Sequence, residues 1–353
     1  MTRHNNFDLL RFLLAGMVVL FHGYVLSRNE QLVLLPRFFS ADIAVKGFFV
    51  VSGYLILRSW DTSAGLADYA SKRARRIYPA YATVVLSCAL VGAVVSYMPL
   101  SRYFSWQWLR YLGANLVFLN FLGPTLPGVF TGNPESAVYG ALWTLKIEVM
   151  FYAIVPVLGW LIRRYGPVAT SLTIYLASVT YALALFHLAD VSARPIFATL
   201  AQQLPGQLSF FMSGVLLYYK ESAARRWLPF TAPVSILLLA WGGPLVDGVL
   251  RPMLLALTII YFAVAFPYLG NFGRFGDFSY GIYIIHFPVI QWLVWTGWFR
   301  SAPWLSLLLA CGLVTAGAFV CWHLVERRFL LRSSHYLRTS KPDPETLATT
   351  TGT

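Results

Sequence analysis

The sequence predicts an all-α membrane protein of about ten transmembrane helices, with both chain termini in the cytoplasm. Two features of its composition point to a membrane: 58% of the 353 residues are hydrophobic and only 12% are charged. The third observation is that the apolar residues form continuous stretches of about 20 residues, long enough for a helix to cross a bilayer. Lipid cannot pair with backbone polar groups, so these stretches must be helical, and their continuity disfavours a β-barrel.

One apolar segment does not fit this pattern of spans. Residues 106–122 contain Arg110, Asn115 and Asn120, so we expect a helix within a long outer loop or one that re-enters the membrane. Residues 1–332 are expected to form one membrane domain, and the polar residues 333–353 a disordered cytoplasmic tail. The expected spans lie at roughly 7–27, 42–60, 78–97, 141–163, 167–188, 206–219, 229–247, 251–269, 278–299 and 303–325.

Basic residues set the expected orientation. With a cytoplasmic N-terminus, the basic runs at 72–76, 163–164 and 225–226 all fall on the cytoplasmic side, as the positive-inside rule requires. The formal net charge of +13 is then explained by loops that face anionic lipid rather than by nucleic acid. The first span has no small-residue cleavage site and carries charged residues, so we expect it to be retained.

The first span holds the most informative polar residues. Arg11 and His22 are separated by about three helical turns and a rise of about 16 Å, so both lie on one helix face, which Asp8 joins. A histidine inside the bilayer can accept and return a proton, as a general base does. The alternative is that Arg11 extends to the interface and His22 only packs between helices.

Two further spans carry ionisable groups near their starts. Glu148 lies five residues into an apolar helix, where it could orient a histidine, bind sugar hydroxyls or pair with a buried arginine. Lys146 points to a different face and is not the obvious partner. Asp42 and Lys46 are spaced to pair on one face, and we expect this ion pair to be structural.

Two other sites are open to a functional or a packing interpretation. Tyr283 and His286 share a face of the ninth span, which suits either a polar pocket or ordinary helix packing. Ser52-Gly53 lacks the flanking glycine of a nucleophile elbow, and we expect it to allow close helix packing.

The basic run KRARR at 72–76 leads into the third span. Arg73 and Arg76 share a helix face and could clamp phosphates, with Arg75 beside them. The alternative is a topology signal beside anionic lipid.

Taken together, these motifs resemble the acyltransferase 3 family of integral-membrane acyltransferases. The resemblance covers about residues 5–330, and the motifs occur in the family's order. One departure is Lys46, where many relatives carry an acidic residue. Many O-antigen modifiers carry a fused extracytoplasmic domain; we expect none here, so the chain looks more like exopolysaccharide or nodulation-factor modifiers. The matching segments are FDLLR at 7–11 with His22 following, FFVVSGYLI at 48–56, KRARRIYPAY at 72–81, WTLKIEVMFY at 143–152, SYGIYIIHFPV at 279–289 and VERRF at 325–329.

The resemblance implies a ten-helix membrane domain and an acyl-coenzyme A donor, most often acetyl-CoA. It implies that His22 is the family's essential histidine and that Arg11 belongs to the same motif. By the same resemblance, Arg73 and Arg76 form a cytoplasmic RxxR motif, and Glu148 is the acidic position after the tryptophan.

The expected function is transfer of an acyl group from acyl-CoA to a hydroxyl of a surface or exported carbohydrate, in the bacterial inner membrane. Arg73, Arg75 and Arg76 would hold the CoA phosphates, the pantetheine arm would pass Arg11, and His22 would act as general base. Acyl-CoA is expected as a co-substrate, and the sequence contains no metal-ligand motif.

The remaining assignments concern the acceptor and the oxyanion. Glu148 would position the acceptor or the imidazole, and Tyr280, His286 and Trp143 are candidate substrate contacts. Either Arg11 or Tyr280 could stabilise the thioester oxyanion, and transfer could be direct or pass through an acyl-enzyme relay.

Two alternatives remain open from the sequence. Intramembrane Arg, His and Glu also serve ion-coupled transporters and flippases, although no inverted repeat is evident. The second is an acyltransferase that modifies a lipid.

Overall fold

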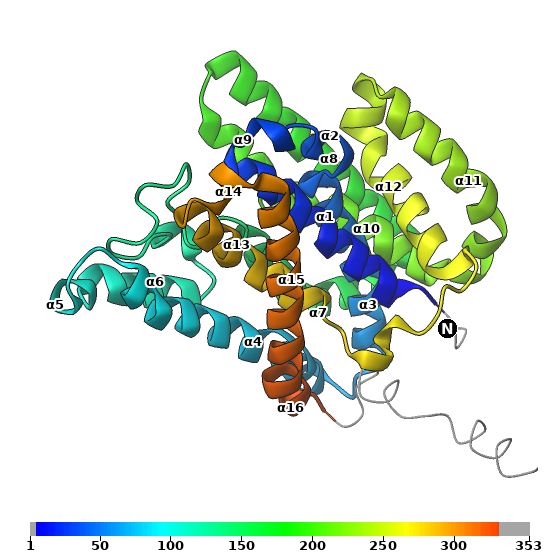
Figure 1. Cartoon of the computed structure of the whole chain (residues 1–353). Coiled ribbons are helices and arrows are strands. Elements are labelled where there is room, and N and C mark those ends of the chain that lie inside the picture. Colours follow the sequence, from blue (N-terminus) through cyan, green and yellow to red (C-terminus); the bar gives the residue numbers. More distant parts are fainter. Residues whose placement is uncertain (1–4, 332–353) are drawn as a thin grey trace, which may run out of the picture. The chain divides into compact units, whose positions relative to one another are not determined.

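The computed structural model describes residues 5–331, and throughout this range the regular elements are helices (Figure 1). Every one of the ten expected spans contains a helix. Seven helical segments of the described chain are long and apolar enough to cross a membrane. The segments that fall short are α10, with 16 residues, α13, with 17, and α11, whose first turns carry Arg225 and Arg226. The expected tail at 333–353 lies outside the described residues.

Contact clustering divides the chain into two compact units. The first comprises residues 5–10, 42–70 and 144–268, and the second comprises residues 11–41, 71–143 and 269–331. The long helices α1 (Phe7–Ser27) and α4 (Leu66–Val95) each contribute residues to both units.

The first unit is a set of packed helices in which α8 contacts both α9 and α10, and α12 contacts α10 and α11. Figure 1 shows α11 and α12 as the yellow-green pair. Its elements are α3 (Ala41–Asp61), α7 (Trp143–Tyr165), α8 (Pro167–Ser192), α9 (Pro195–Ala201), α10 (Leu204–Tyr219), α11 (Glu221–Trp241), the π-helical turn η3 (Val246–Leu250), α12 (Arg251–Ile260) and the π-helical turn η4 (Tyr261–Ala265).

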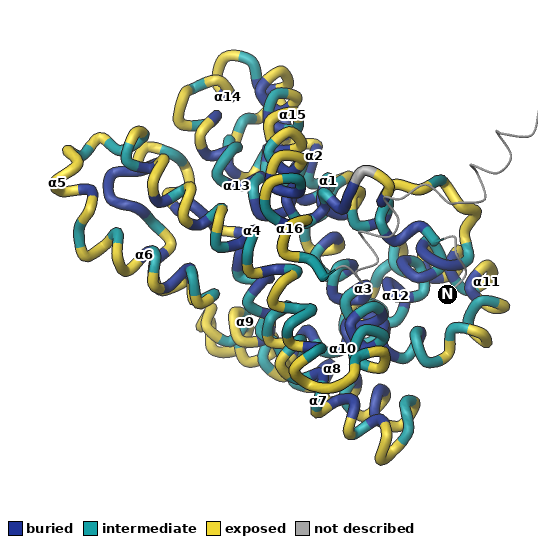
Figure 2. The backbone as a smooth tube through the Cα atoms, turned by 90° about the horizontal axis from the view of Figure 1, so that it is seen from below, coloured by how far each residue is buried: buried dark blue, intermediate teal, exposed yellow. Residues whose placement is uncertain are grey.

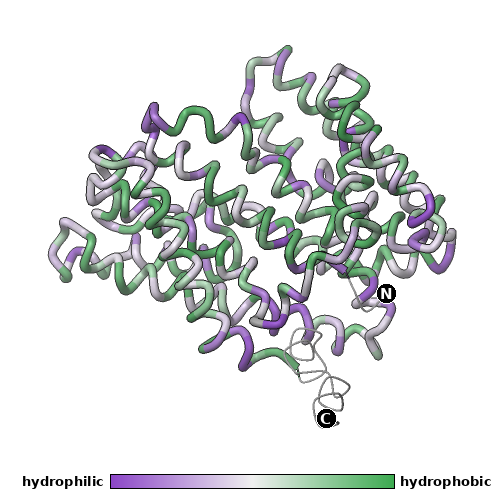
Figure 3. Tube along the Cα trace, turned by 45° about the vertical axis from the view of Figure 1, so that its right-hand side comes forward, coloured by the Kyte–Doolittle hydropathy of each residue, from purple (hydrophilic) through white to green (hydrophobic). Residues whose placement is uncertain are grey.

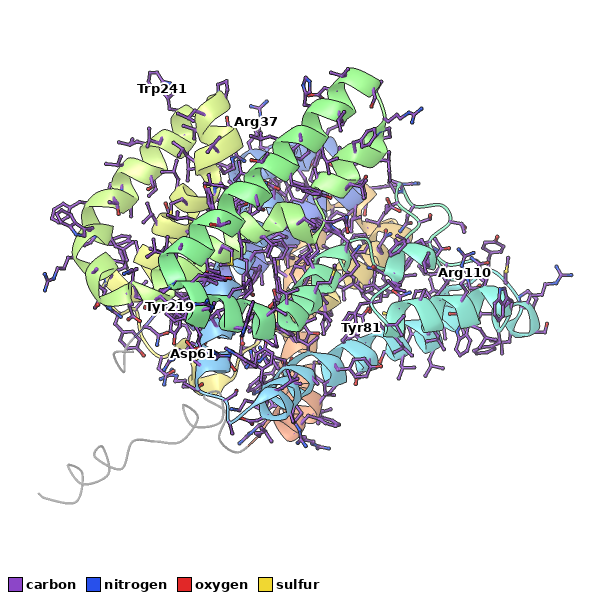
Figure 4. The ribbon with its side chains drawn as sticks, turned by 180° about the vertical axis from the view of Figure 1, so that it is seen from behind. Arg37, Asp61, Tyr81, Arg110, Tyr219 and Trp241 are labelled. Carbon is purple, nitrogen blue, oxygen red and sulfur yellow. The ribbon has the colours of Figure 1, made fainter. Side chains whose placement is uncertain are left out.

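Small residues bring α3 and α10 into backbone contact. A Cβ atom on Gly53 would lie 2.0 Å from the carbonyl oxygen of Phe211, and one on Gly214 would lie 2.1 Å from that of Val50. The expectation that Gly53 allows close helix packing is therefore confirmed. At the end of this pair, the Tyr219 hydroxyl donates to Asp61 Oδ2 at 2.8 Å (Figure 4).

The second unit is built on the pair α13 and α15, which contact each other closely because Gly281 faces Ala318. On α4, the carbonyl oxygen of Ala89 accepts hydrogen bonds from the Tyr103 hydroxyl and Trp108 Nε1, which attach α5 and α6 to that helix. Its other elements are η1 (Glu30–Leu32), α2 (Leu35–Phe38), α5 (Leu100–Tyr103), α6 (Trp106–Leu116), η2 (Asn120–Leu122), η5 (Phe272–Phe275), α13 (Ser279–Trp295), α14 (Trp298–Ser301), α15 (Pro303–Cys321), the π-helical turn η6 (Trp322–Glu326) and α16 (Arg327–Phe329).

An irregular segment at 123–142 covers part of α13 in the second unit. Its residues 126–130 and 137–139 are buried (Figure 2). Gln291 Nε2 donates to the carbonyl oxygens of Glu135 and Ala137 at 2.7 and 2.8 Å, and the Tyr283 hydroxyl donates to that of Ala141 at 3.1 Å. The expected helix at 106–122 is present as α6 and η2.

Several helix limits differ from the expected ones for identifiable reasons. Helix α4 begins at Leu66 rather than at 78, because the basic run continues the helix beyond its apolar part. Helix α11 ends at Trp241 rather than at 247, because Gly242 and Gly243 adopt positive φ angles of 73° and 112° and stop it. Pro267 follows the turn that ends the span expected at 251–269.

The helices expose much of their apolar surface, as expected in lipid. The apolar window of α8 has a mean hydropathy of 1.6, yet only 17% of it is buried within the protein. Figure 3 shows long hydrophobic runs along the helices, and Trp241 at the end of α11 is 91% exposed (Figure 4). A helix that is apolar on all sides but not covered by protein requires a membrane around it.

Candidate active site

His22 lies in the last turns of α1 and is half-buried. Its Nδ1 atom is 2.9 Å from the carbonyl oxygen of Val18, one turn earlier. A carbonyl oxygen can only accept, so we assign the hydrogen to Nδ1, and the neutral ring then presents Nε2 as an acceptor. Within the described residues, both hydrogen-bond contacts of His22 use Nδ1. Nε2 is therefore the atom that can take a proton from a substrate.

A second histidine faces this ring from α13. His286 is fully buried, its Nε2 lies 3.2 Å from His22 Nδ1, and the two ring centroids are 4.9 Å apart. Its own Nδ1 lies 2.7 Å from the carbonyl oxygen of Tyr283. Phe287 packs against His22 with the ring centroids 5.5 Å apart. The second unit therefore brings together two histidines that the sequence places in its first and ninth spans.

Four charged residues form a buried arginine–carboxylate cluster in the same unit: Arg11, Arg76, Asp277 and Glu326. Arg11 Nη1 lies 2.7 Å from Asp277 Oδ2, and Arg76 Nη2 contacts the same oxygen. Arg76 Nη1 lies 2.6 Å from Glu326 Oε2. None of the four side chains is more than 11% exposed. The two arginines are each paired with a carboxyl group, as burial of a cation requires.

The two carboxylates differ in how many hydrogen bonds their oxygens accept. Asp277 Oδ1 accepts from the Ser279 hydroxyl at 2.5 Å and from the Ser279 amide at 3.3 Å, while Oδ2 serves both arginines. Burial by itself raises the pKa of Asp277, but Arg11, Arg76 and the Ser279 hydrogen bonds outweigh it and hold the pKa below its usual value. Glu326 Oε1, by contrast, is buried with no hydrogen-bond partner among residues 5–331.

Sequence reasoning gave neither of these carboxylates a role. Glu326 belongs to the VERRF segment, and Asp277 lies two residues before SYGIYIIH. A signal was present, because an acidic residue at the edge of a span needs a cation. The first span supplies Arg11, and the basic run before the third span supplies Arg76.

Tyr280 belongs to the arginine–carboxylate cluster rather than to the histidine pair. Its ring centroid lies 5.6 Å from the Arg76 guanidinium carbon, and its hydroxyl donates to the carbonyl oxygen of Ile77 at 3.0 Å. Arg11 is about 16 Å from His22 along the axis of α1. The two residues suggested as oxyanion donors, Arg11 and Tyr280, therefore both lie at the arginine–carboxylate cluster and not beside His22.

The basic run at 72–76 is helical, so Arg73 and Arg76 do share a face of α4. Arg76 is committed to the two carboxylates of the cluster. Arg73 is half-buried, whereas Arg75 is exposed and donates from Nε to Ser71 Oγ at 3.2 Å.

The first unit holds Glu148, on α7. The Ser52 hydroxyl lies 2.7 and 2.9 Å from the two carboxylate oxygens of Glu148, so Ser52 is a partner of this acid as well as a neighbour of Gly53. Lys146 donates to Gln203 Oε1 at 2.6 Å. Trp143 is the first residue of α7 and is half-buried.

The pair expected at the start of the second span is also present. Lys46 Nζ lies 2.8 Å from Asp42 Oδ2, and the ion pair is largely exposed on the aspartate side, as a structural surface pair would be.

Apolar helices left uncovered by protein, together with ionisable side chains buried inside one of their bundles, define a multi-pass membrane protein with an internal polar site. The chain belongs to the acyltransferase 3 family: a family model described as an acyltransferase domain matches residues 4–323. The protein is therefore a membrane acyltransferase.

Two relatives resemble the chain over nearly their whole length. An O-acetyl transferase of Shigella phage Sf6 is 28% identical over 350 residues, which cover 95% of this chain and 98% of the relative. Nodulation protein 10 of Rhizobium leguminosarum bv. viciae is 27% identical over 348 residues, which cover 92% of each chain. No solved structure matches the chain.

Proposed function

We propose that this protein moves an acyl group, most simply acetyl, from acyl-CoA to a hydroxyl of a surface or exported carbohydrate. The family and the relative named O-acetyl transferase support transfer to oxygen. The proposal includes ten transmembrane helices, cytoplasmic termini and a bacterial inner membrane, for which the basic runs of the sequence are the support.

The observation that carries the proposal is the tautomer of the His22 ring. Because Nδ1–H is directed at the Val18 carbonyl, Nε2 holds a lone pair for the acceptor hydroxyl. In the proposed reaction, Nε2 takes the hydroxyl proton while the hydroxyl oxygen attacks the thioester carbon. The tetrahedral intermediate then expels the CoA thiolate, which receives the proton from His22, so that an ester and free CoA leave the site.

The donor would approach along α1 and α4. Arg73 and Arg75 would contact the CoA phosphates. Arg76 contacts Asp277 and Glu326. The pantetheine arm would pass Arg11 and run along the face of α1 that leads to His22. In this scheme Arg76 orients the basic helix, and Arg11 contacts the donor at a distance from the thioester.

The acceptor would be bound by residues that the sequence already singled out. Glu148, with Ser52 hydrogen-bonded to it, offers a carboxylate for a sugar hydroxyl. Trp143 and Tyr280 remain proposed substrate contacts.

The test is transfer of radiolabelled acetyl from acetyl-CoA into surface polysaccharide by membranes that contain the intact protein, His22→Ala or His187→Ala. His187 is an exposed histidine on α8 and serves as the matched control. We expect label with the intact protein and the His187 variant, and a loss of at least about 100-fold with His22→Ala. Equal labelling in all three would remove His22 from the chemistry. Absence of label with the intact protein would refute the proposed donor or acceptor.

A further inference from the structure

His286 has no role in the proposed acyl transfer, yet it is fully buried and contacts His22, the proposed base. A buried polar group of this kind needs satisfied hydrogen bonds, and the geometry specifies which atoms carry the hydrogens.

The hydrogen positions follow from two carbonyl oxygens. His286 Nδ1 lies 2.7 Å from the carbonyl oxygen of Tyr283, so Nδ1 must be its donor and the neutral ring leaves Nε2 as an acceptor. That Nε2 lies 3.2 Å from His22 Nδ1, which must then carry a hydrogen. The Val18 carbonyl at 2.9 Å independently requires a hydrogen on the same atom.

Only one arrangement satisfies both requirements. His22 Nδ1–H is shared between the Val18 oxygen and His286 Nε2, as in a three-centre hydrogen bond. A second N–H on His286 would point at the Nδ1–H of His22, so only the neutral form of His286 fits both contacts. The two acceptors therefore select the same tautomer of His22.

We propose that His286 is a positioning residue for His22: it holds the base in the Nδ1–H tautomer and stabilises the imidazolium that forms on proton transfer. This inference rests on the proposed function, because it assigns His22 as the base. Serine hydrolases use a carboxylate to hold the catalytic imidazole, and here a neutral imidazole nitrogen fills that place. His286 thus acts through His22, in contrast to the substrate contact expected from the sequence.

Two amide variants separate this role from a structural one. Gln at 286 places a side-chain oxygen near the position of Nε2 and keeps an acceptor for His22. Asn is too short to do so, although its amide can still donate to the Tyr283 carbonyl as Nδ1 does. Both variants bury one amide in place of the ring, so they are matched in polarity.

The experiment measures kcat and the KM for surface polysaccharide as acceptor, with acetyl-CoA as donor. It compares the purified intact protein, His286→Gln and His286→Asn at equal amounts of monodisperse protein. We expect His286→Asn to lose about 10- to 100-fold in kcat with an unchanged acceptor KM, because partners that orient a reactive imidazole have effects of this size. We expect His286→Gln to retain kcat within about fivefold.

Equal losses of kcat in the two variants would overturn the positioning role, and so would a rise in acceptor KM with kcat unchanged. His22→Ala measured alongside separates the two proposals. If His22→Ala stays active, the proposed base is wrong. If His22→Ala is inactive while the two His286 variants do not differ, only the role of His286 is wrong.

Discussion

Asp277 is the residue on which the arginine–carboxylate cluster depends most. Replacing it by Asn keeps the size of the side chain and an oxygen for the Ser279 donors, but removes the negative charge that faces both arginines. Its Oδ2 contacts both Arg11 and Arg76, and its side chain is only 2% exposed. Loss of one partner from a buried ion pair typically costs about 3–5 kcal/mol, because the remaining charge stays buried. We expect Asp277→Asn to lower the free energy of unfolding by about that amount.

Glu326→Gln provides the matched control within the same cluster. Glu326 contacts Arg76 through one oxygen, and its other oxygen is already buried without a partner in the described chain. Since Arg76 keeps Asp277 in this variant, we expect a smaller loss of about 1–2 kcal/mol. Equilibrium unfolding by SDS from mixed micelles, followed by tryptophan fluorescence, measures both values. Equal losses for the two variants would refute the assignment of Asp277 as the shared counter-charge.

A double-mutant cycle isolates the ion pair itself. Arg11→Gln removes the cation that Asp277→Asn leaves in excess, so the double variant should be more stable than the sum of the single losses predicts. For directly contacting residues we expect a coupling of about 1–3 kcal/mol. Additive losses, within about 0.5 kcal/mol, would mean that Arg11 and Asp277 do not stabilise each other.

The pH dependence of unfolding gives an independent check. Burial alone raises the pKa of Asp277, but the arginines and Ser279 hold it below the usual 3.8. A depressed pKa adds stability that is fully present above 3.8 and is lost as the pH falls through the lower value of the folded protein. The stability difference between the intact protein and Asp277→Asn should therefore shrink as the pH falls below about 4.

Three further predictions concern helix packing at Gly53, the hydrogen bond between Ser52 and Glu148, and binding of the acyl-CoA donor. Gly53→Ala should destabilise the protein by about 3 kcal/mol or more, because its Cβ would overlap the backbone of Phe211. Gly16 has open space around it, so Gly16→Ala should be neutral or stabilise the protein by up to about 1 kcal/mol. Unfolding by SDS measures both variants. Ser52→Ala should lower stability by about 1–2 kcal/mol and raise the acceptor KM, while Ser52→Thr keeps the hydroxyl for Glu148 and should change the KM less. Arg73→Gln should raise the KM for acetyl-CoA about tenfold but leave the KM for S-acetylpantetheine, which has no phosphate, unchanged. An equal change of KM for both donors would show that Arg73 does not contact the CoA phosphates.

The sequence predicted where the long helices form and which side chains share a face of one helix. Arg11 and His22 do lie along one face of α1, and Lys46 does pair with Asp42, because both relations depend only on helical spacing. The helix ends were harder to predict from the sequence, because charged turns such as those before Tyr78 continue a helix beyond its apolar part.

Partners from distant segments could not be read from spacing. His22 and His286 are 264 positions apart, and Arg11 and Asp277 are 266 apart. Periodicity in a single sequence shows that a side chain faces other helices, but it does not show which helix lies there. The expectation that buried charges must balance would have narrowed the partners of Arg11 to a few acidic residues, and Asp277 was among them.

The cluster and the histidine pair are connected by the geometry of α1. Turning this helix by one residue would rotate His22 by 100° and shift it by about 1.5 Å, which would separate Nδ1 from His286. The ion pair between Arg11 and Asp277 opposes such a slip, because it fixes both the rotation and the axial position of the helix about three turns from His22. Buried ion pairs are poor sources of stability but are well suited to set register. Arg11 can thus be required for the proposed transfer without touching the reacting atoms, which would explain why it shares a helix face with the proposed base about 16 Å away.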